Sequence, residues 1–277
     1  MLECCDRQDR GADMLTGMPS ETLFEKKKLR SKAQVTVAIS CFNYGREGVE
    51  ALDSLLAQTE ETIDVVVVDD HSLDDSAEVL RDWCHANCEA GKFNNILLER
   101  HLQNQGLSYS RNTAISFVQT PYVFILDADN QLYPRALQVL REALENSGYA
   151  MAYSLIERFG AQHIIANNSI WLPEKLSYGN YIDAMALIRT DVLRQLGGYR
   201  IMPNKFGWED YDLWCSLVDH GLKGCHVPQI LCRYRVHGRS MTQTVTKPFL
   251  SDDPKLSAEW QRIRDDLKAH HKMPFLF

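Results

Sequence analysis

The 277-residue sequence has no apolar run long enough to cross a bilayer, which takes about 18 or more consecutive apolar residues. Residues 1–6 are polar and do not resemble a secretory signal. Positive charge is also scarce, since 30 Lys and Arg face 37 Asp and Glu and leave a net charge of −7. Such an acidic chain argues against a nucleic-acid-binding surface. We therefore expect a soluble, cytoplasmic protein that binds no nucleic acid.

Two kinds of motif are missing as well. The eight cysteines contain no C-x-x-C pair, and Cys84 and Cys88, which are four residues apart, have no second pair nearby to complete a metal site. No glycine-rich phosphate loop and no G-x-G-x-x-G motif follows the apolar run at residues 35–41. This argues against a sugar-phosphate nucleotidyltransferase and against a nicotinamide-dependent enzyme.

Apolar runs and helical periodicities alternate from residue 35 to residue 146. The apolar runs predict strands at residues 35–41, 63–70, 95–99 and 122–126. The periodic stretches predict helices near residues 49–56, 77–88, 107–118 and 134–146. This alternation is typical of an α/β fold with a mostly parallel sheet and right-handed crossovers.

The pattern differs in the rest of the chain. Residues 149–188 are expected to add short antiparallel strands, and the later elements are a helix at 191–196, a helix at 208–220, an extended segment at 224–236 and an amphipathic helix at 254–270. A short helix is also predicted at residues 22–29. Its lysines at positions 26–28 form either a solvated face or a weak contact with a membrane surface.

Asp127 and Asp129 directly follow the buried run at residues 122–126. Residues i and i+2 of an extended chain point to the same side, so both carboxylates can face one point at the carboxyl edge of the sheet. They form either a polar turn or a site for a hard divalent cation such as Mg²⁺ or Mn²⁺.

Two further polar clusters follow predicted strands. Asp69 and Asp70 either cap the next helix or accept hydrogen bonds from a base or a ribose hydroxyl. Gly106 precedes the helix at 107–118, where a glycine permits close backbone approach and a helix amino terminus favours phosphate. Arg111 lies within reach of the same edge.

Glu209, Asp210 and Asp212 crowd the start of the helix at 208–220, beside Trp208. A helix cap needs one acid, and mutual repulsion with partial burial would raise the pKa of at least one, as a general base requires. His237 ends the extended segment; it is either a surface residue or a third metal ligand.

Taken together, these motifs resemble family 2 glycosyltransferases. The motifs that carry the resemblance occur in order at residues 35–43 (VTVAISCFN), 67–72 (VVDDHS), 104–106 with 110–112 (NQG and SRN), 126–129 (LDAD), 207–210 (GWED) and 234–237 (YRVH). The resemblance covers about residues 34–242.

The resemblance implies the GT-A fold, a Rossmann-like αβα sandwich with a mostly parallel central sheet and small antiparallel additions. Residues 34–130 would form the nucleotide-binding half and residues 131–242 the acceptor-binding half of one domain. Residues 1–33 would be a polar extension, and residues 243–277 a helical tail.

The resemblance also implies roles for individual residues. Asp210 would be the catalytic base, with Glu209 beside it contacting donor or acceptor. Asp129 and His237 would bind the metal, with Asp127 on the ribose, sugar or metal. The remaining donor-binding residues would be Ser40, Phe42, Asn43, Asp70, Gly106 and Arg111.

The implied activity is inverting transfer from a nucleotide sugar, expected to be a UDP-sugar, with Mn²⁺ or Mg²⁺ as cofactor. The expected acceptor is a glycan or a lipid-linked sugar, met at the inner face of the membrane with peripheral contact at most. The alternative is an inactive module of the same fold that binds a nucleotide sugar or a glycan. Two departures concern base recognition: Ser40-Cys41 replaces an edge that often contains proline, and His71 replaces a common glycine.

Overall fold

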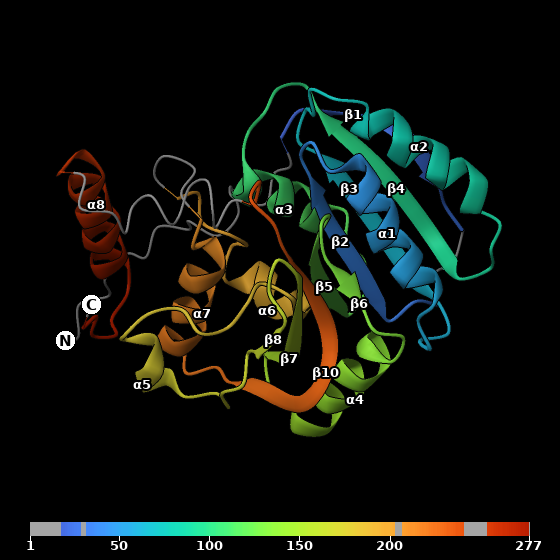
Figure 1. Ribbon diagram of the computed structural model, residues 1–277. Helices are drawn as coiled ribbons and strands as arrows, with labels where there is room; N and C mark the ends of the chain where they lie inside the picture. Colours follow the sequence, from blue (N-terminus) through green and yellow to red (C-terminus); the bar gives the residue numbers. More distant parts are fainter. Residues whose placement is uncertain (1–17, 29–31, 203–206, 241–253, 277) are drawn as a thin grey trace, which may run out of the picture.

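The computed structural model describes residues 18–28, 32–202, 207–240 and 254–276 (Figure 1). Within these ranges, ten strands form one sheet in the order β1-β4-β3-β2-β5-β9-β7-β10-β6, and β8 pairs with β7. The strands are β1 (Ser20–Lys26), β2 (Val35–Cys41), β3 (Ile63–Asp69), β4 (Phe93–His101), β5 (Tyr122–Asp127), β6 (Gln131–Leu132), β7 (Met151–Gly160), β8 (Ile164–Ala166), β9 (Ala186–Arg189) and β10 (Gly224–Val236).

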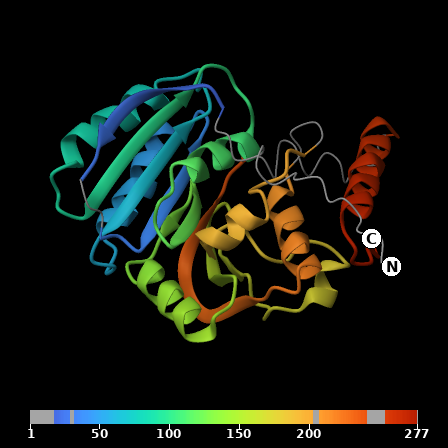
Figure 2. The same ribbon diagram turned by 180° about the vertical axis from the view of Figure 1, so that it is seen from behind.

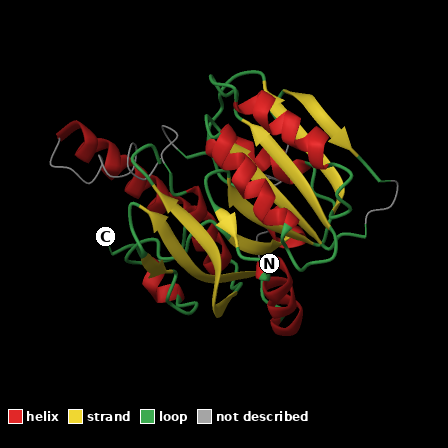
Figure 3. Ribbon diagram, turned by 45° about the vertical axis from the view of Figure 1, so that its right-hand side comes forward, coloured by secondary structure: helices red, strands yellow, loops and turns green. Residues whose placement is uncertain are grey.

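Helices cover both faces of this sheet (Figure 3). They are α1 (Gly45–Leu56), α2 (Ser76–Asn87), α3 (Leu107–Ser116), α4 (Ala136–Ser147), α5 (Pro173–Leu176), α6 (Thr190–Gln195), α7 (Glu209–Asp219) and α8 (Pro254–His270). One core includes apolar residues of α1, α2 and α4. A second core, on the other face, includes residues of α3, α6, α7 and α8. The view from behind shows α3, α6 and α7 on this side of the molecule (Figure 2).

The predicted parallel sheet is confirmed. Strands β4, β3, β2 and β5 run parallel to one another, and all seven residues of β3 are buried. Continuous burial explains why the centre of β3 is apolar without alternation, since helices cover both of its faces. The antiparallel additions are β1, β6, β8 and β9.

The predicted helix at residues 22–29 is wrong. Residues 20–26 form β1, which pairs antiparallel with β4 at one edge of the sheet, so part of the segment at 1–33 belongs to the sheet. Hydrogen bonds to β4 outweigh the local preference of this polar stretch, a tertiary effect that propensity does not report. The Lys26 ammonium donates to the carbonyl of Cys88.

The second half of the sheet depends on a long parallel pair rather than on short strands alone. β7 has ten residues and pairs with β10 from Met151 opposite Gly224 to Gly160 opposite Val236. The register shifts between Val227 and Ile230, the stretch that contains Pro228. Proline cannot donate a ladder hydrogen bond, so an irregularity here accommodates it.

None of the helices that the structure describes has the length and the apolar character needed to span a membrane.

The last helix is anchored to α7 by buried charges. His271, just after α8, lies between two carboxylates of α7, with Nε2 3.0 Å from Asp212 Oδ1 and Nδ1 2.8 Å from Asp219 Oδ2. Arg200 joins Asp212 to Asp266 of α8. Burial alone would lower the pKa of His271, but the hydrogen bonds and charges of Asp212 and Asp219 outweigh it and raise that pKa.

We expect His271→Gln to lower the free energy of unfolding by about 1–3 kcal/mol, because a buried charged hydrogen bond is lost. A raised histidine pKa contributes stability that is fully present below pH 6.5 and lost as pH rises through the folded-state pKa. The difference in melting temperature between wild type and variant should therefore be larger at pH 6 than at pH 9.

His270→Gln is the matched control, because its side chain is 47 % exposed and belongs to the same end of α8. It should leave the melting temperature nearly unchanged. An equal effect of both substitutions, or a His271 effect independent of pH, would contradict this anchor.

Candidate active site

The carboxyl ends of three neighbouring strands form one edge of the site. Cys41 of β2 lies opposite Asp69 of β3, and Ser40 of β2 lies opposite Asp127 of β5. Parallel pairing aligns these ends, so the polar residues that follow each apolar run meet at the same edge.

A cleft of about 490 Å³ opens at this edge, and we call it the strand-end cleft. Most of the donor-binding residues predicted from the sequence line it together with Asp129: Ser40, Phe42, Asn43, Asp70, Gly106 and Asp127. His237 reaches the same region through Asp129. The structure therefore brings residues from five separate sequence motifs to one place.

Asp70 organises the loop that closes the cleft. Its Oδ1 accepts hydrogen bonds from Gln105 N at 2.8 Å and lies 2.7 Å from Nδ1 of buried His101. Its Oδ2 accepts from Gly106 N at 2.7 Å and from the Asn104 amide at 2.9 Å. Both oxygens of the Asp70 carboxylate are thus hydrogen-bonded within the protein. The backbone N–H groups of residues 105 and 106 donate to this carboxylate and are not free to bind a phosphate. Base recognition by Asp70 stays a prediction.

Two non-glycine residues that follow strands β2 and β3 adopt left-handed backbone. Asn43 and His71 both have φ of 60°. Asn43 is held there because its N–H donates to Ser72 Oγ and its Oδ1 accepts from Leu73 N. The φ of His71 gives a physical reason for the glycine that the family resemblance leads one to expect, since glycine adopts this conformation without strain.

Asp129 and His237 form the best candidate metal site. The Nε2 atom of His237 lies 3.0 Å from Oδ2 of Asp129, and burial followed by the charge of Asp127 raises the pKa of Asp129. One carboxylate and one imidazole suit a divalent cation that takes its other ligands from a diphosphate. The residues present therefore fit such an ion. Among the described residues, however, no group of three or more His, Cys, Asp or Glu is arranged to hold a metal.

The third predicted ligand, Asp127, points to a different partner. Its Oδ1 accepts a hydrogen bond of 2.8 Å from Arg111, whose other terminal nitrogen donates to Glu209. Arg111 is only 2 % exposed and stacks over the Tyr199 ring at 5.1 Å. Arg111 thus lies between two acids of the site, and its predicted contact with a nucleotide is not tested by this geometry.

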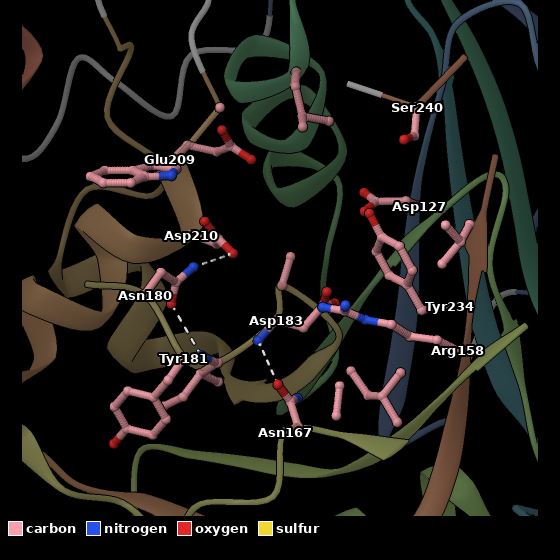
Figure 4. A pocket seen from close by; sticks show the side chains of 18 of the residues that line it. Asp127, Arg158, Asn167, Asn180, Tyr181, Asp183, Glu209, Asp210, Tyr234 and Ser240 are labelled. Carbon is pink, nitrogen blue, oxygen red and sulfur yellow. Dashed lines mark hydrogen bonds between the residues drawn. The ribbon is translucent and has the colours of Figure 1, made fainter. Parts of the chain in front are cut away.

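A second cavity of about 440 Å³ adjoins the strand-end cleft and shares Leu107, Asp127 and Tyr234 with it. We call it the inner cavity. Glu209 and Asp210 lie on its wall at the start of α7, and Asp183 and Asn180 face them from the segment before β9 (Figure 4). Arg158 of β7 extends into it from the opposite side, near Tyr234.

The acids of the inner cavity have raised pKa values. Burial, reinforced by the charges of Glu209 and Asp183, raises the pKa of Asp210 to about 8. Burial also raises the pKa of Asp183 to about 6 and raises that of Glu209. Asp210 is held by two hydrogen bonds, from its neighbour Tyr211 N at 2.7 Å and from the Asn180 amide at 3.0 Å. A fixed carboxylate with a pKa near neutrality is suited to general base catalysis.

Trp208 fixes the start of α7. It has φ of 91°, a strained conformation for a bulky residue, and its ring packs edge-on against Tyr211 and against Trp260 of α8. Such strain persists where the surroundings hold it in place, often at functional sites. The helix dipole also favours the acids in the first turn of α7.

The far wall of the inner cavity consists largely of residues that the sequence motifs do not predict. Its polar residues outside the predicted motifs include Arg158, Asn167, Asn180 and Asp183. Tyr234 opens a motif already quoted, and Asp183 is an isolated acid ahead of an apolar strand. The remaining residues are single polar side chains on β7 and on loops, with no spacing that predicts a site.

Known proteins resemble this chain in sequence. A family model described as glycosyl transferase family 2 matches residues 36–202. The Escherichia coli protein named UDP-Glc:alpha-D-GlcNAc-diphosphoundecaprenol beta-1,3-glucosyltransferase WfaP is 22 % identical over 244 residues, which cover 88 % of this chain and 91 % of that protein.

Two solved structures share the fold. S. aureus TarS (1–349) in complex with UDP-GlcNAc superposes with a TM-score of 0.68 at 14 % identity, covering 87 % of this chain and 68 % of that one. Mannosyltransferase PcManGT from Pyrobaculum calidifontis, in complex with GDP-Man and Mn²⁺, gives 0.59 at 18 % identity, covering 93 % and 75 %. The predicted GT-A architecture is thereby confirmed.

The metal assignment can be tested by calorimetric titration of UDP in Mn²⁺ and in EDTA. We expect Asp129→Asn to weaken Mn²⁺-dependent UDP binding by at least about tenfold, because one of the two candidate protein ligands is lost. Asp82→Asn is the control, since Asp82 lies on α2 with a side chain that is 77 % exposed. Unchanged Mn²⁺-dependent affinity in Asp129→Asn would rule out this ligand.

Proposed function

Because the chain belongs to glycosyl transferase family 2, we propose that it moves a sugar from a nucleoside diphosphate sugar to a hydroxyl of a glycan or lipid-linked acceptor. A UDP-sugar is the proposed donor and Asp210 the proposed general base. The observation that carries the proposal is the position of Asp210, a fixed carboxylate with a raised pKa, in a cavity that adjoins the strand-end cleft.

The names of related proteins support the substrate classes. WfaP is named for a UDP-glucose donor and a lipid diphosphate acceptor, and TarS and PcManGT were solved with UDP-GlcNAc and GDP-Man. A role in surface polysaccharide synthesis at the cytoplasmic face of a membrane is consistent with such acceptors.

In this proposal, the two cavities bind the two substrates. The strand-end cleft would hold the nucleotide, with Ser40, Phe42 and Asn43 along its edge. The sugar would then lie near Asp127, which both cavities share, and the acceptor hydroxyl would lie in the inner cavity. Holding the two reactants in line supplies much of the rate enhancement in such a transfer.

In the transfer itself, Asp210 accepts the proton of the acceptor hydroxyl while the hydroxyl oxygen bonds to the anomeric carbon. The bond from that carbon to the diphosphate oxygen breaks, and the nucleoside diphosphate leaves with the electron pair. Attack from the face opposite the leaving group inverts the anomeric centre. Mn²⁺ or Mg²⁺ held by Asp129 and His237 would neutralise the charge that builds on the diphosphate.

Asp210 must be deprotonated to act, so turnover should fall as pH drops below about 8, the pKa of that group. Glu209 raises this pKa through its charge, and Arg111 opposes it. The fixed contacts from Tyr211 and Asn180 keep the carboxylate oriented while its protonation changes.

Asp210→Asn is the decisive variant for the base. The donor is first identified by thermal stabilisation with UDP, GDP, dTDP and CDP, each with and without Mn²⁺. We then expect the variant to bind the selected nucleotide as wild type does but to lose about 10²–10⁴-fold in turnover of the corresponding nucleotide sugar, measured by nucleotide release.

Asp191→Asn, at a side chain that is 66 % exposed on α6, is the matched control and should turn over normally. Near-normal turnover in Asp210→Asn would move the base to Glu209. Nucleotide binding without turnover in wild type, with any sugar nucleotide and acceptor, would instead favour the inactive binding module.

A further inference from the structure

The far wall of the inner cavity contains an acid that has no role in the transfer proposed above. Asp183 lies between α5 and β9 and lines the cavity together with Asp210. Its Oδ1 accepts a hydrogen bond of 3.0 Å from Met185 N. Within the described residues, no donor reaches its Oδ2, so this oxygen is available to a ligand in the cavity.

The surroundings of Asp183 hold it rigidly. Asn167 accepts a hydrogen bond of 3.0 Å from the Asp183 N–H, and its own amide nitrogen is buried with no acceptor among the described residues. Asn180 accepts from Ile182 N and donates to Asp210 (Figure 4). Asn180 thus connects the proposed base to the residue that precedes Asp183.

The charges of the cavity indicate which sugars fit. Its lining includes four carboxylates, those of Asp127, Asp183, Glu209 and Asp210, against the guanidiniums of Arg111 and Arg158. Arg111 is already paired with two of these acids, and Arg158 extends toward Asp183. An anionic sugar would meet uncompensated negative charge, whereas a neutral sugar presents the O–H donors that carboxylates accept.

Aromatic side chains are also present. Trp208, Tyr181 and Tyr234 line the same cavity around the polar groups. A cavity with a few fixed polar groups and several aromatic rings is typical of a site for a small, largely neutral ligand.

We propose that Asp183, together with Asn167, forms a subsite that binds a hydroxyl group of a neutral acceptor sugar next to the hydroxyl that Asp210 deprotonates. The subsite rests on the proposed glycosyl transfer and defines its acceptor as a neutral hexose or N-acetylhexosamine unit. Asp183 orients the acceptor and takes no proton from it, so it is a positioning residue.

The test uses the full chain, the nucleotide sugar that wild type turns over, and two aryl glycosides as acceptors. These are 4-nitrophenyl β-D-glucopyranoside, which is neutral, and 4-nitrophenyl β-D-glucuronide, which carries a carboxylate. Nucleotide release is measured with each acceptor and with water alone. We expect the neutral glycoside, and not the glucuronide, to accelerate release by wild type.

Asp183→Asn should raise KM for the neutral glycoside by about 10–100-fold, because a hydrogen bond to a charged acceptor is lost. KM for the donor should stay near its wild-type value. Asp210 faces Asp183, Arg111 and Glu209, so removing the Asp183 charge should also shift the acid limb of turnover to lower pH. A rise in KM for the glycoside without a rise in KM for the donor is the result that a purely structural role of Asp183 would not produce.

Asp191→Asn serves again as the exposed control. If Asp183→Asn melts below the assay temperature, Asn167→Ser tests the other polar wall and should raise the same KM. An unchanged glycoside KM and pH profile in a folded Asp183 variant would overturn the subsite alone, as would preference for the glucuronide. No nucleotide release by wild type under any condition would overturn the proposed transfer and the subsite with it.

Discussion

The site depends on one buried cation, Arg111. Its guanidinium donates to Asp127 at the end of β5 and to Glu209 at the start of α7, and it is almost fully enclosed. Both carboxylates strongly favour the charged guanidinium, which raises the pKa of Arg111 well above its usual value despite burial. Arginine suits this position because its planar fork holds two carboxylates at once. Arg111 therefore fixes the position of the strand-end cleft relative to that of the inner cavity.

The charges of the inner cavity depend on the pairing of Arg111 with Glu209. The negative charge of Glu209 helps to keep the pKa of Asp210 high, whereas Arg111 lowers the pKa values of both acids. The start of α7 is held from behind by Trp208 against Trp260, and its far end by His271 between Asp212 and Asp219. The carboxyl-terminal helix therefore supports the helix that carries the proposed base, although it lies outside the matched family region.

Much of this could be predicted from the sequence because it depends on local patterns. Buried strands end in polar motifs, and parallel pairing brings these ends together, so the cleft residues from Ser40 to Asp129 could be expected as a group. Long-range contacts could not. β1 exists because β4 offers an edge, Asp70 is saturated by a loop more than thirty residues away, and Asp183 is a single acid with no spacing that marks it.

The role of Arg111 is tested most directly by replacing it with lysine. Lysine keeps the charge but cannot hold two carboxylates in the same geometry. Donor affinity by calorimetry and turnover by nucleotide release are measured on the same preparation, with the melting temperature as a check of folding. We expect both donor affinity and turnover to fall in a folded Arg111→Lys protein. Wild-type donor affinity and wild-type turnover in this variant would show that the guanidinium of Arg111 does not hold the two cavities in the geometry that the transfer needs.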